Sequence, residues 1–199
     1  TGGRGGPAGR HFRRCGVRVC RLRHTWRPMI RLATFADLGL LPDIERSAAG
    51  RFLGTPMAWA SAGDPLPAPV LAQALADGLL WVALDDAGLP VGFALARPLD
   101  ADLFLAEMSV ALPQQGRGLG GALLQAVVDH ASAARIYRAV TLTTDRELPW
   151  NGPFYRRSGF VEVPAEQQGP QLRAQLRHEA DAGFDPARRC AMRLPLTAS

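Results

Sequence analysis

A glycine-rich turn stands between a strand-like run and a helix-like run in the middle of the chain. The run Leu103–Val110 has the character of a strand, and the apolar positions recur at helical spacing from Gly118 to Ala133. The turn between them, Gln115-Gly116-Arg117-Gly118-Leu119-Gly120-Gly121, lets the backbone approach a ligand closely because glycine has no Cβ. The first N–H groups of a helix lack internal acceptors and carry partial positive charge, so the pattern predicts a pyrophosphate site. The simpler interpretation, a turn that only lets the helix pack closely, requires fewer glycines.

Three kinds of phosphate-binding loop could produce this pattern. A Walker loop requires Gly-Lys-Ser/Thr, and the chain has no lysine, which excludes it. The dinucleotide fingerprint G-x-G-x-x-G is formally completed by Gly116, Gly118 and Gly121. It lies late in the chain, however, and the acidic residue expected about 20 positions further on is absent from Ile136–Val140.

The third interpretation is a family resemblance. Gln115–Gly120 resembles motif A of the GNAT acyltransferase superfamily, Q/R-x-x-G-x-G/A, matched by the glutamine, the second glycine and the third. Phe154–Phe160 resembles the closing F-Y-x-x-x-G-F of that family, and Glu107–Pro113 resembles its fourth strand and the exit from it. Arg31–Leu38 resembles the first strand and helix, so the resemblance covers about residues 29–195.

The fold that the resemblance implies is a mixed α/β fold of the GNAT type. It has a mainly antiparallel central sheet of about six to seven strands flanked by helices, splayed between strands 4 and 5. Periodicity and turn residues predict strands at 29–32, 79–84, 91–96, 103–110, 140–144, 160–163 and 190–194, and helices at 32–52, 70–76, 118–133, 153–158 and 172–182. Thr34 and Asp37 form a predicted capping box, and Glu45 with Arg46 is expected on the solvated face of the first helix.

The resemblance also implies acetyl-CoA as co-substrate, no metal, and direct transfer of the acyl group to an amine without a covalent enzyme intermediate. The backbone of the fourth strand should line the pantetheine arm and the amides of the glycine turn should hold the pyrophosphate, with Arg117 able to add a charge-assisted contact. The expected cofactor-binding residues are Met108, Ser109, Val110, Gln115, Gly116, Arg117, Gly118, Leu119, Gly120, Gly121 and Asn151.

Amine attack on a thioester requires a neutral nucleophile and a protonated thiolate leaving group. Tyr155 matches the acid of the family, a phenol able to donate a proton to the departing sulfur; the alternative is core packing beside Phe154. Glu107 is the expected base, acting directly or through water; the alternative is a solvated or ion-paired carboxylate. Asp145 and Glu147, just past the fifth strand, are alternative bases.

The segment before Tyr155 departs from the family pattern. Many relatives carry an Asn seven residues before the tyrosine, a position that Leu148 occupies here. Asn151, four residues before the tyrosine, either contacts the cofactor or caps the short helix. Trp150 either covers the cofactor or acceptor or packs on the sheet.

The acceptor should bind between the first helix, residues 51–69 and the end of the fifth strand. Apolar surface is expected there from Phe52, Met57, Trp59 and Trp81. Asp64 is the single acidic residue of that loop, so the strongly acidic cluster that suits a polyamine or an aminoglycoside is missing. The nature of the amine, small molecule or protein N-terminus or side chain, stays open.

Charge is distributed unevenly along the chain. The formal net charge is +5, yet eight arginines and no acidic residue fall in residues 1–28, and from Met29 onward 15 arginines face 18 acidic residues. We expect residues 1–28 to be a disordered or non-native extension, with Met29 as a natural start, and residues 29–199 to be a single GNAT domain. A basic arm for nucleic acid or an anionic membrane is the alternative.

The remaining composition favours one soluble globular domain. The 47% hydrophobic content suits one soluble domain, and no apolar run approaches the ~20 residues of a membrane span. Three cysteines form no disulfide framework or zinc spacing, which favours the reducing cytoplasm. The main hypothesis is an N-acetyltransferase with acetyl-CoA and an amine as partners, without nucleic acid or membrane, and with a homodimer left open. A non-catalytic acyl-CoA sensor and a nucleic-acid binder using residues 1–28 are the rival hypotheses.

Overall fold

The computed structural model describes residues 1–3 and 28–197, so the expectation for residues 1–28 falls mostly on a segment outside the described residues. Within the described part, seven strands form one sheet in the order β1-β2-β3-β4-β5-β7-β6. Neighbouring strands are antiparallel except β4 and β5, which are parallel. The strands are β1 (Met29–Leu32), β2 (Leu80–Leu84), β3 (Pro90–Leu99), β4 (Asp102–Val110), β5 (Ala139–Asp145), β6 (Val161–Glu162) and β7 (Arg189–Pro195). The predicted mixed α/β sheet is therefore confirmed.

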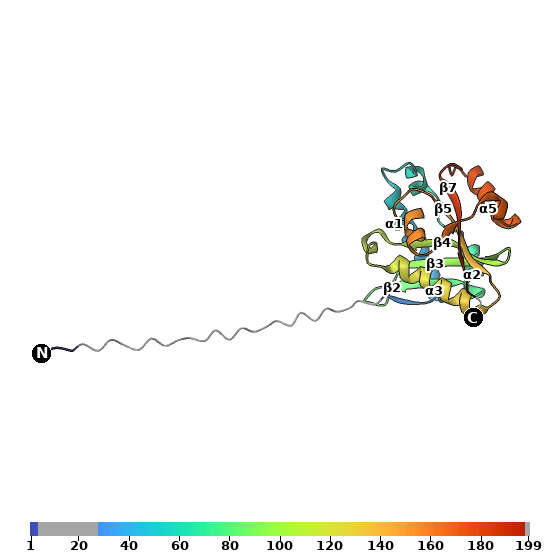
Figure 1. Cartoon of the computed structure of the whole chain (residues 1–199). Coiled ribbons are helices and arrows are strands. Elements are labelled where there is room, and N and C mark those ends of the chain that lie inside the picture. Colours follow the sequence, from blue (N-terminus) through green and yellow to red (C-terminus); the bar gives the residue numbers. More distant parts are fainter. Residues whose placement is uncertain (4–27, 198–199) are drawn as a thin grey trace.

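Helices cover both faces of this sheet, as Figure 1 shows for α3, which lies across one face. On that face the buried stripe of α3 and residues of α4 pack on β2 to β5, and on the other face α1 and α2 pack on β2 and β3. The helices are α1 (Leu41–Ala49), α2 (Ala68–Ala76), α3 (Leu119–Ala134), α4 (Gly152–Arg157) and α5 (Pro170–Asp181). None of the helices in the described part is long and apolar enough to cross a membrane.

The first predicted helix is divided into three consecutive pieces. A 3-10 helix, η1 (Phe35–Leu40), leads into α1, and a further 3-10 turn, η2 (Gly50–Phe52), follows it. The Asp37 carboxylate accepts the Thr34 backbone N–H at 2.6 Å, as the predicted capping box requires. Arg31 of β1 also donates two hydrogen bonds to this carboxylate, at 2.7 and 2.9 Å, which fixes the entry into η1.

Two irregularities of β4 position the site. Its pairing with β5 covers only Leu103 to Leu105, opposite Val140 to Leu142, and the following residues of β4 have no partner on β5. The two strands therefore separate halfway along the sheet, as the predicted splay requires. On the β3 side the register shifts, because Glu107 lies opposite Leu95 while Leu105 lies opposite Ala96. Ala106 is thus an extra residue, a β-bulge that changes the direction of the side chains after it.

Candidate active site

The glycine turn has the backbone conformation that its sequence predicts. Gly116 and Gly118 have φ angles of +76° and +84°, in the left-handed region that favours glycine, and Gly118 is the N-cap of α3. The first regular bond of the helix runs from the Ala122 N–H to the Gly118 carbonyl, at 3.1 Å. The N–H groups of Leu119, Gly120 and Gly121, which come before it, have no carbonyl within the helix to bond to. A Cβ at Gly116, Gly118 or Gly121 would meet no atom within 4 Å, so space for a ligand lies beside the turn.

Gln115 holds this turn in place with both ends of its side-chain amide. Its Nε2 donates to the carbonyl of Val110 at the end of β4, at 2.9 Å. Its Oε1 accepts a hydrogen bond from Arg51 of η2, at 2.8 Å. The guanidinium of Arg51 also lies 4.3 Å from the ring centroid of Trp150. Gln115 therefore connects the glycine turn to the far wall of the site.

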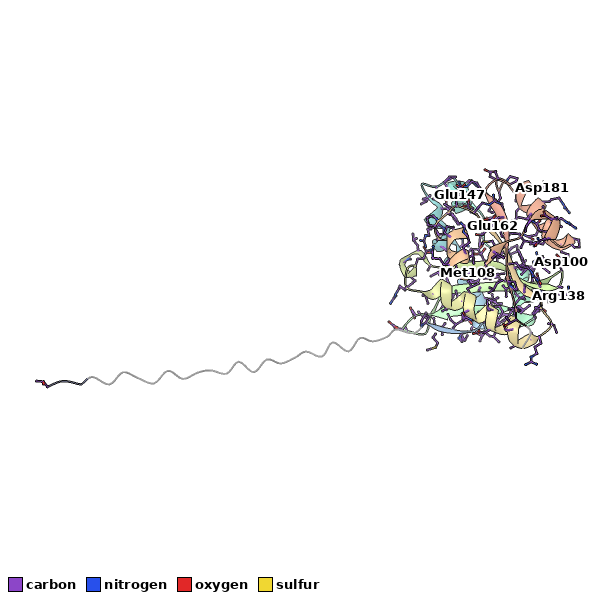
Figure 2. All side chains as sticks on the ribbon, viewed as in Figure 1. Asp100, Met108, Arg138, Glu147, Glu162 and Asp181 are labelled. Atoms are coloured by element: carbon purple, nitrogen blue, oxygen red, sulfur yellow. The ribbon has the colours of Figure 1, made fainter. Side chains whose placement is uncertain are left out.

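A cavity of about 730 Å³ opens where β4 and β5 separate. It is lined by the unpaired half of β4, the end of β5, the glycine turn, α1 and α4. Figure 2 shows Met108 beside the beginning of α3, and its Cε would lie 3.9 Å from a Cβ at Gly120. The cavity brings together most of the predicted site residues: Glu107, Met108, Ser109, Val110, Gln115, Gly116, Gly118, Leu119, Gly120, Gly121, Asn151 and Tyr155. Arg117 is not among the lining residues, and its side chain bonds to Gln114 at the surface.

Tyr155 reaches the cavity from α4 and is 9% exposed. Its ring makes edge-on contacts with Phe154 and Phe160, with centroids 5.0 and 5.7 Å away. Burial raises the pKa of the phenol, and the negative charge of Glu107 raises this pKa further. Tyr155 therefore stays protonated over a wide pH range and is available as a proton donor.

Glu107 follows the bulge of β4 and lines the same cavity. Its Oε1 accepts hydrogen bonds from the Ser109 hydroxyl at 2.8 Å and from the Met108 backbone N–H at 3.1 Å. Burial raises the pKa of this carboxyl, whereas the hydrogen bonds and the positive charge of Arg189 oppose the rise. A carboxylate with a raised pKa is a better proton acceptor than an ordinary surface glutamate.

Glu45 is a site residue that the sequence did not reveal. The prediction of a solvated Glu45 is wrong, because the side chain is half-buried in the cavity wall and its Oε2 accepts the Leu66 backbone N–H at 3.0 Å. Burial raises the pKa of Glu45 to about 7, with a further contribution from the charge of Glu107. Leu41 and Ile44 of α1 are buried, and Glu45 lies beside them on the helix. This position next to the apolar stripe is the sequence signal from which the burial of Glu45 could have been predicted.

Comparison with known proteins agrees with this geometry. The profile of the acetyltransferase (GNAT) domain matches residues 76–162, which contain β4, the glycine turn, α3, β5 and α4. The predicted resemblance to the GNAT superfamily is therefore confirmed for this part of the chain. The glycine turn lies inside the matched segment, whereas the cavity is also lined by residues outside it, from α1, η2 and the segment around Phe184.

Solved structures show the same GNAT fold. An acetyltransferase of the GNAT family from Staphylococcus aureus Mu50 superposes with a TM-score of 0.63 at 16% identity, over 86% of this chain and 100% of that one. Phosphinothricin acetyltransferase from Sinorhizobium meliloti, solved with acetyl-CoA, gives 0.60 at 20% identity, over 85% and 88%. The PaiA N-acetyltransferase from Thermoplasma acidophilum, solved with coenzyme A, gives 0.60 at 14% identity, over 85% and 99%. At these identities the likeness concerns the fold.

The two alternative bases, Asp145 and Glu147, are held away from the cavity. Asp145 is 2% exposed and pairs with Arg188 at 2.9 Å, and neither Asp145 nor Glu147 is among the lining residues. Burial alone would raise the pKa of Asp145, but the N–H of Leu148, Arg188 and the N–H of Glu147 outweigh it and lower that pKa. Figure 2 shows Glu147 beyond the end of β5. Asp145 is therefore a structural anchor of the loop rather than a proton acceptor.

The aromatic residues expected at the acceptor site divide into two groups. Phe52 lines the cavity and lies 6.4 Å from Trp150, which also lines it. Trp81, in contrast, is a core residue that packs against His130, so its predicted place at the acceptor site is wrong. Trp59 is not a lining residue and packs edge-on against Phe184, which the sequence did not single out and which lines the cavity.

Asn151 lines the cavity, but its side chain does not cap α4. Instead its backbone carbonyl accepts the Tyr155 N–H at 3.0 Å. Asn151 thus occupies the predicted N-cap position of α4, but without a capping bond from its side chain. The cofactor contact expected of Asn151 stays a prediction.

Proposed function

We propose that this chain is an N-acyltransferase that moves an acetyl group from acetyl-CoA directly to the nitrogen of an amine. The observation that carries the proposal is one cavity in which an anion-binding helix start, an unpaired strand edge, a buried phenol and a carboxylate meet. A second site for a covalent intermediate is not needed, because both substrates can reach the same cavity. We propose residues 29–199 as the functional domain.

The proposal assigns the phosphate end of acetyl-CoA to the glycine turn. The N-terminus of α3 offers amides and partial positive charge, and the open space beside Gly116 and Gly118 is where a pyrophosphate can approach the backbone. The amides of the pantetheine arm would pair with backbone groups of Met108 to Val110 on the side that lacks β5, apart from the Met108 N–H and the Val110 carbonyl, which are already bonded to Glu107 and Gln115. The solved relatives with acetyl-CoA or coenzyme A support this choice of ligand.

Two side chains carry the proton transfers. Glu107 accepts a proton from the nitrogen as that atom bonds to the thioester carbonyl carbon. When the carbon–sulfur bond breaks, the Tyr155 hydroxyl donates its proton to the sulfur. The negative charge of Glu107 raises the pKa of Tyr155, so the phenol keeps its proton until the sulfur needs it. The phenol can then recover its proton from Glu107.

Acetyl-CoA is expected to raise the melting temperature of the chain. A ligand at about 100 times its Kd stabilises the native state by about 2.7 kcal/mol, or about 5–10 °C for a protein of this size. The measurement is a thermal melt with acetyl-CoA, and with NAD and ATP as controls. A shift with NAD or ATP and none with acetyl-CoA would exclude the assignment of the glycine turn.

Turnover is tested by incubating the chain with labelled acetyl-CoA and a panel of amines, including a metabolite extract, and by following label transfer with mass spectrometry. Transfer that depends on Tyr155 and Glu107 supports the enzyme. If acetyl-CoA stabilises the chain but no amine is acylated, the domain is an acyl-CoA sensor and the catalytic proposal is wrong.

A further inference from the structure

Two carboxylates line the cavity from different elements. Glu45 comes from α1 and Glu107 from β4, on elements that pack against each other. Both are close enough for the charge of Glu107 to raise the pKa of Glu45. The reaction as proposed above uses only one of these carboxylates, which leaves Glu45 without a role.

Each carboxylate keeps an oxygen that no described protein group occupies. Glu45 accepts the Leu66 N–H through Oε2, and Glu107 accepts Ser109 and Met108 through Oε1. Among the described residues, no donor reaches Oε1 of Glu45 or Oε2 of Glu107. A half-buried carboxylate oxygen is stabilised by a donor, and a protonated amine brings up to three.

Among the described residues no cation forms an ion pair with Glu45, although the charge of Arg46 lowers its pKa and partly opposes the effect of burial. On α1 itself, Arg46 pairs with Asp43 at the surface. The neighbouring η1 carries Asp37, already paired with Arg31, and the neighbouring η2 carries Arg51, bonded to Gln115. Two strands pack against α1. Strand β3 carries Arg97, which is bonded to Gln175. Strand β4 carries Glu107 and also Asp102, which is paired with Arg193. From the other walls, Arg189 pairs with Glu179, and Tyr155 is neutral.

We propose that Glu45 is a second catalytic carboxylate, which with Glu107 receives the acceptor as a protonated primary amine and takes its first proton. The inference rests on the proposed function and assigns the acceptor to amines that arrive as ammonium ions. Phe52 and Phe184 provide apolar walls in the same cavity for the carbon skeleton next to the nitrogen.

The proton balance of this route is complete. One ammonium N–H bond breaks as Glu45 gains a proton, which leaves a neutral nitrogen with a lone pair. The nitrogen bonds to the thioester carbon, and its second proton passes to Glu107. The carbon–sulfur bond breaks, Tyr155 protonates the sulfur, and Glu107 returns a proton to Tyr155. Glu45 releases its proton to water, so ammonium and thioester give amide, thiol and one proton.

The first test replaces Glu45 with glutamine, which keeps the size and can still accept the Leu66 N–H. We expect kcat/KM for the amine at pH 7.5 to fall about 10- to 100-fold, because a hydrogen bond to a charged group is lost. KM for acetyl-CoA should stay within about twofold. In the native chain kcat/KM should rise through about pH 7 as Glu45 ionises, and E45Q should lack this step. Asp43→Asn, on the exposed side of the same helix, is the matched control and should keep the native values.

The second test reads stability rather than turnover. The pKa of Glu45 is raised from 4.5 to about 7 in the folded chain, so this group costs stability as the pH rises from about 4.5 to about 7, and the cost stays constant at higher pH. E45Q should therefore melt above the native chain at pH 8, by roughly 3–6 °C after allowance for solvent screening, and the gap should shrink towards pH 5. Glu45→Asp, which keeps the charge, should restore part of the pH step in kcat/KM.

The outcomes separate the two proposals. If the native chain binds acetyl-CoA but acylates no amine, the proposed function is wrong and the role of Glu45 falls with it. If the native chain is active and E45Q keeps both the kcat/KM and its pH step, only the role of Glu45 is wrong. An E45Q chain that melts below the native chain at pH 8, or fails to fold, also contradicts the inference.

Discussion

Replacing Tyr155 with phenylalanine is expected to lower kcat for acyl transfer about 100- to 1000-fold, the range of a lost general acid. The substitution removes one oxygen and keeps the ring, so the contacts with Phe154 and Phe160 persist. Because the hydroxyl belongs to the chemical step, binding of acetyl-CoA should change by less than about twofold. The measurement is kcat from initial rates, with the acetyl-CoA-dependent melting shift recorded on the same preparation.

The chain offers a matched control for this substitution. It has two tyrosines, and the other, Tyr137, packs partly buried against the same core without lining the cavity. Tyr137→Phe should leave kcat unchanged. Burial raises the pKa of Tyr155, so alkaline loss of its proton should not limit the native enzyme at ordinary assay pH. If Tyr155→Phe keeps the native kcat, the phenol is not the acid and a water molecule must protonate the sulfur.

Gly152→Ala is expected to disturb both the fold and the site. An added Cβ would overlap the Arg146 carbonyl oxygen, and would lie 2.9 Å from its carbonyl carbon and 3.0 Å from the Asp145 carbonyl oxygen. These are backbone atoms, and Arg188 holds the side chain of Asp145, so they cannot move aside easily. We expect the free energy of unfolding to fall by about 2–3 kcal/mol, the cost of overpacking, together with a loss of kcat.

The loss of kcat arises because Gly152 begins α4, the helix that carries Tyr155. Any shift that relieves the overlap moves the phenol relative to Glu107. The measurement is urea unfolding of the variant and the native chain, together with kcat. Gly39→Ala is the control, since a Cβ there meets no atom within 4 Å and its φ is ordinary. If Gly152→Ala keeps the native stability and kcat, the prediction is wrong, because the loop before α4 then moves aside to accept the added Cβ.

Local pattern was sufficient for most of the fold. The helical spacing of Leu119, Leu123 and Val127 predicted α3, and these residues are buried. The β-branched run before Asp145 predicted β5, and the glycines predicted a tight turn, in which Gly116 and Gly118 have positive φ angles. In each case the information lies within one element, where periodicity and backbone preference act directly.

The parts of the site that depend on contacts between distant segments could not be predicted. Glu45 was expected in solvent because helical spacing identifies the apolar stripe of α1. It does not show which other segment packs against the residues at the edge of that stripe. The bulge at Ala106 depends on the pairing of β4 with β3. The tight contact at Gly152 depends on how the loop after β5 folds back. Trp81 was misplaced because an aromatic residue on a strand fits either face of the sheet.

Gln115 has a consequence for how the two substrates influence each other. Through Arg51 it connects the glycine turn, where acetyl-CoA is proposed to bind, to Trp150 in the acceptor wall. Ligands at the two ends of such a connection change each other's affinity by the same factor, because binding free energies are reciprocal. We expect coenzyme A to lower the Kd of the amine, and the amine to lower that of coenzyme A equally, in a titration calorimeter. With Gln115→Ala the two Kd values should become independent of each other.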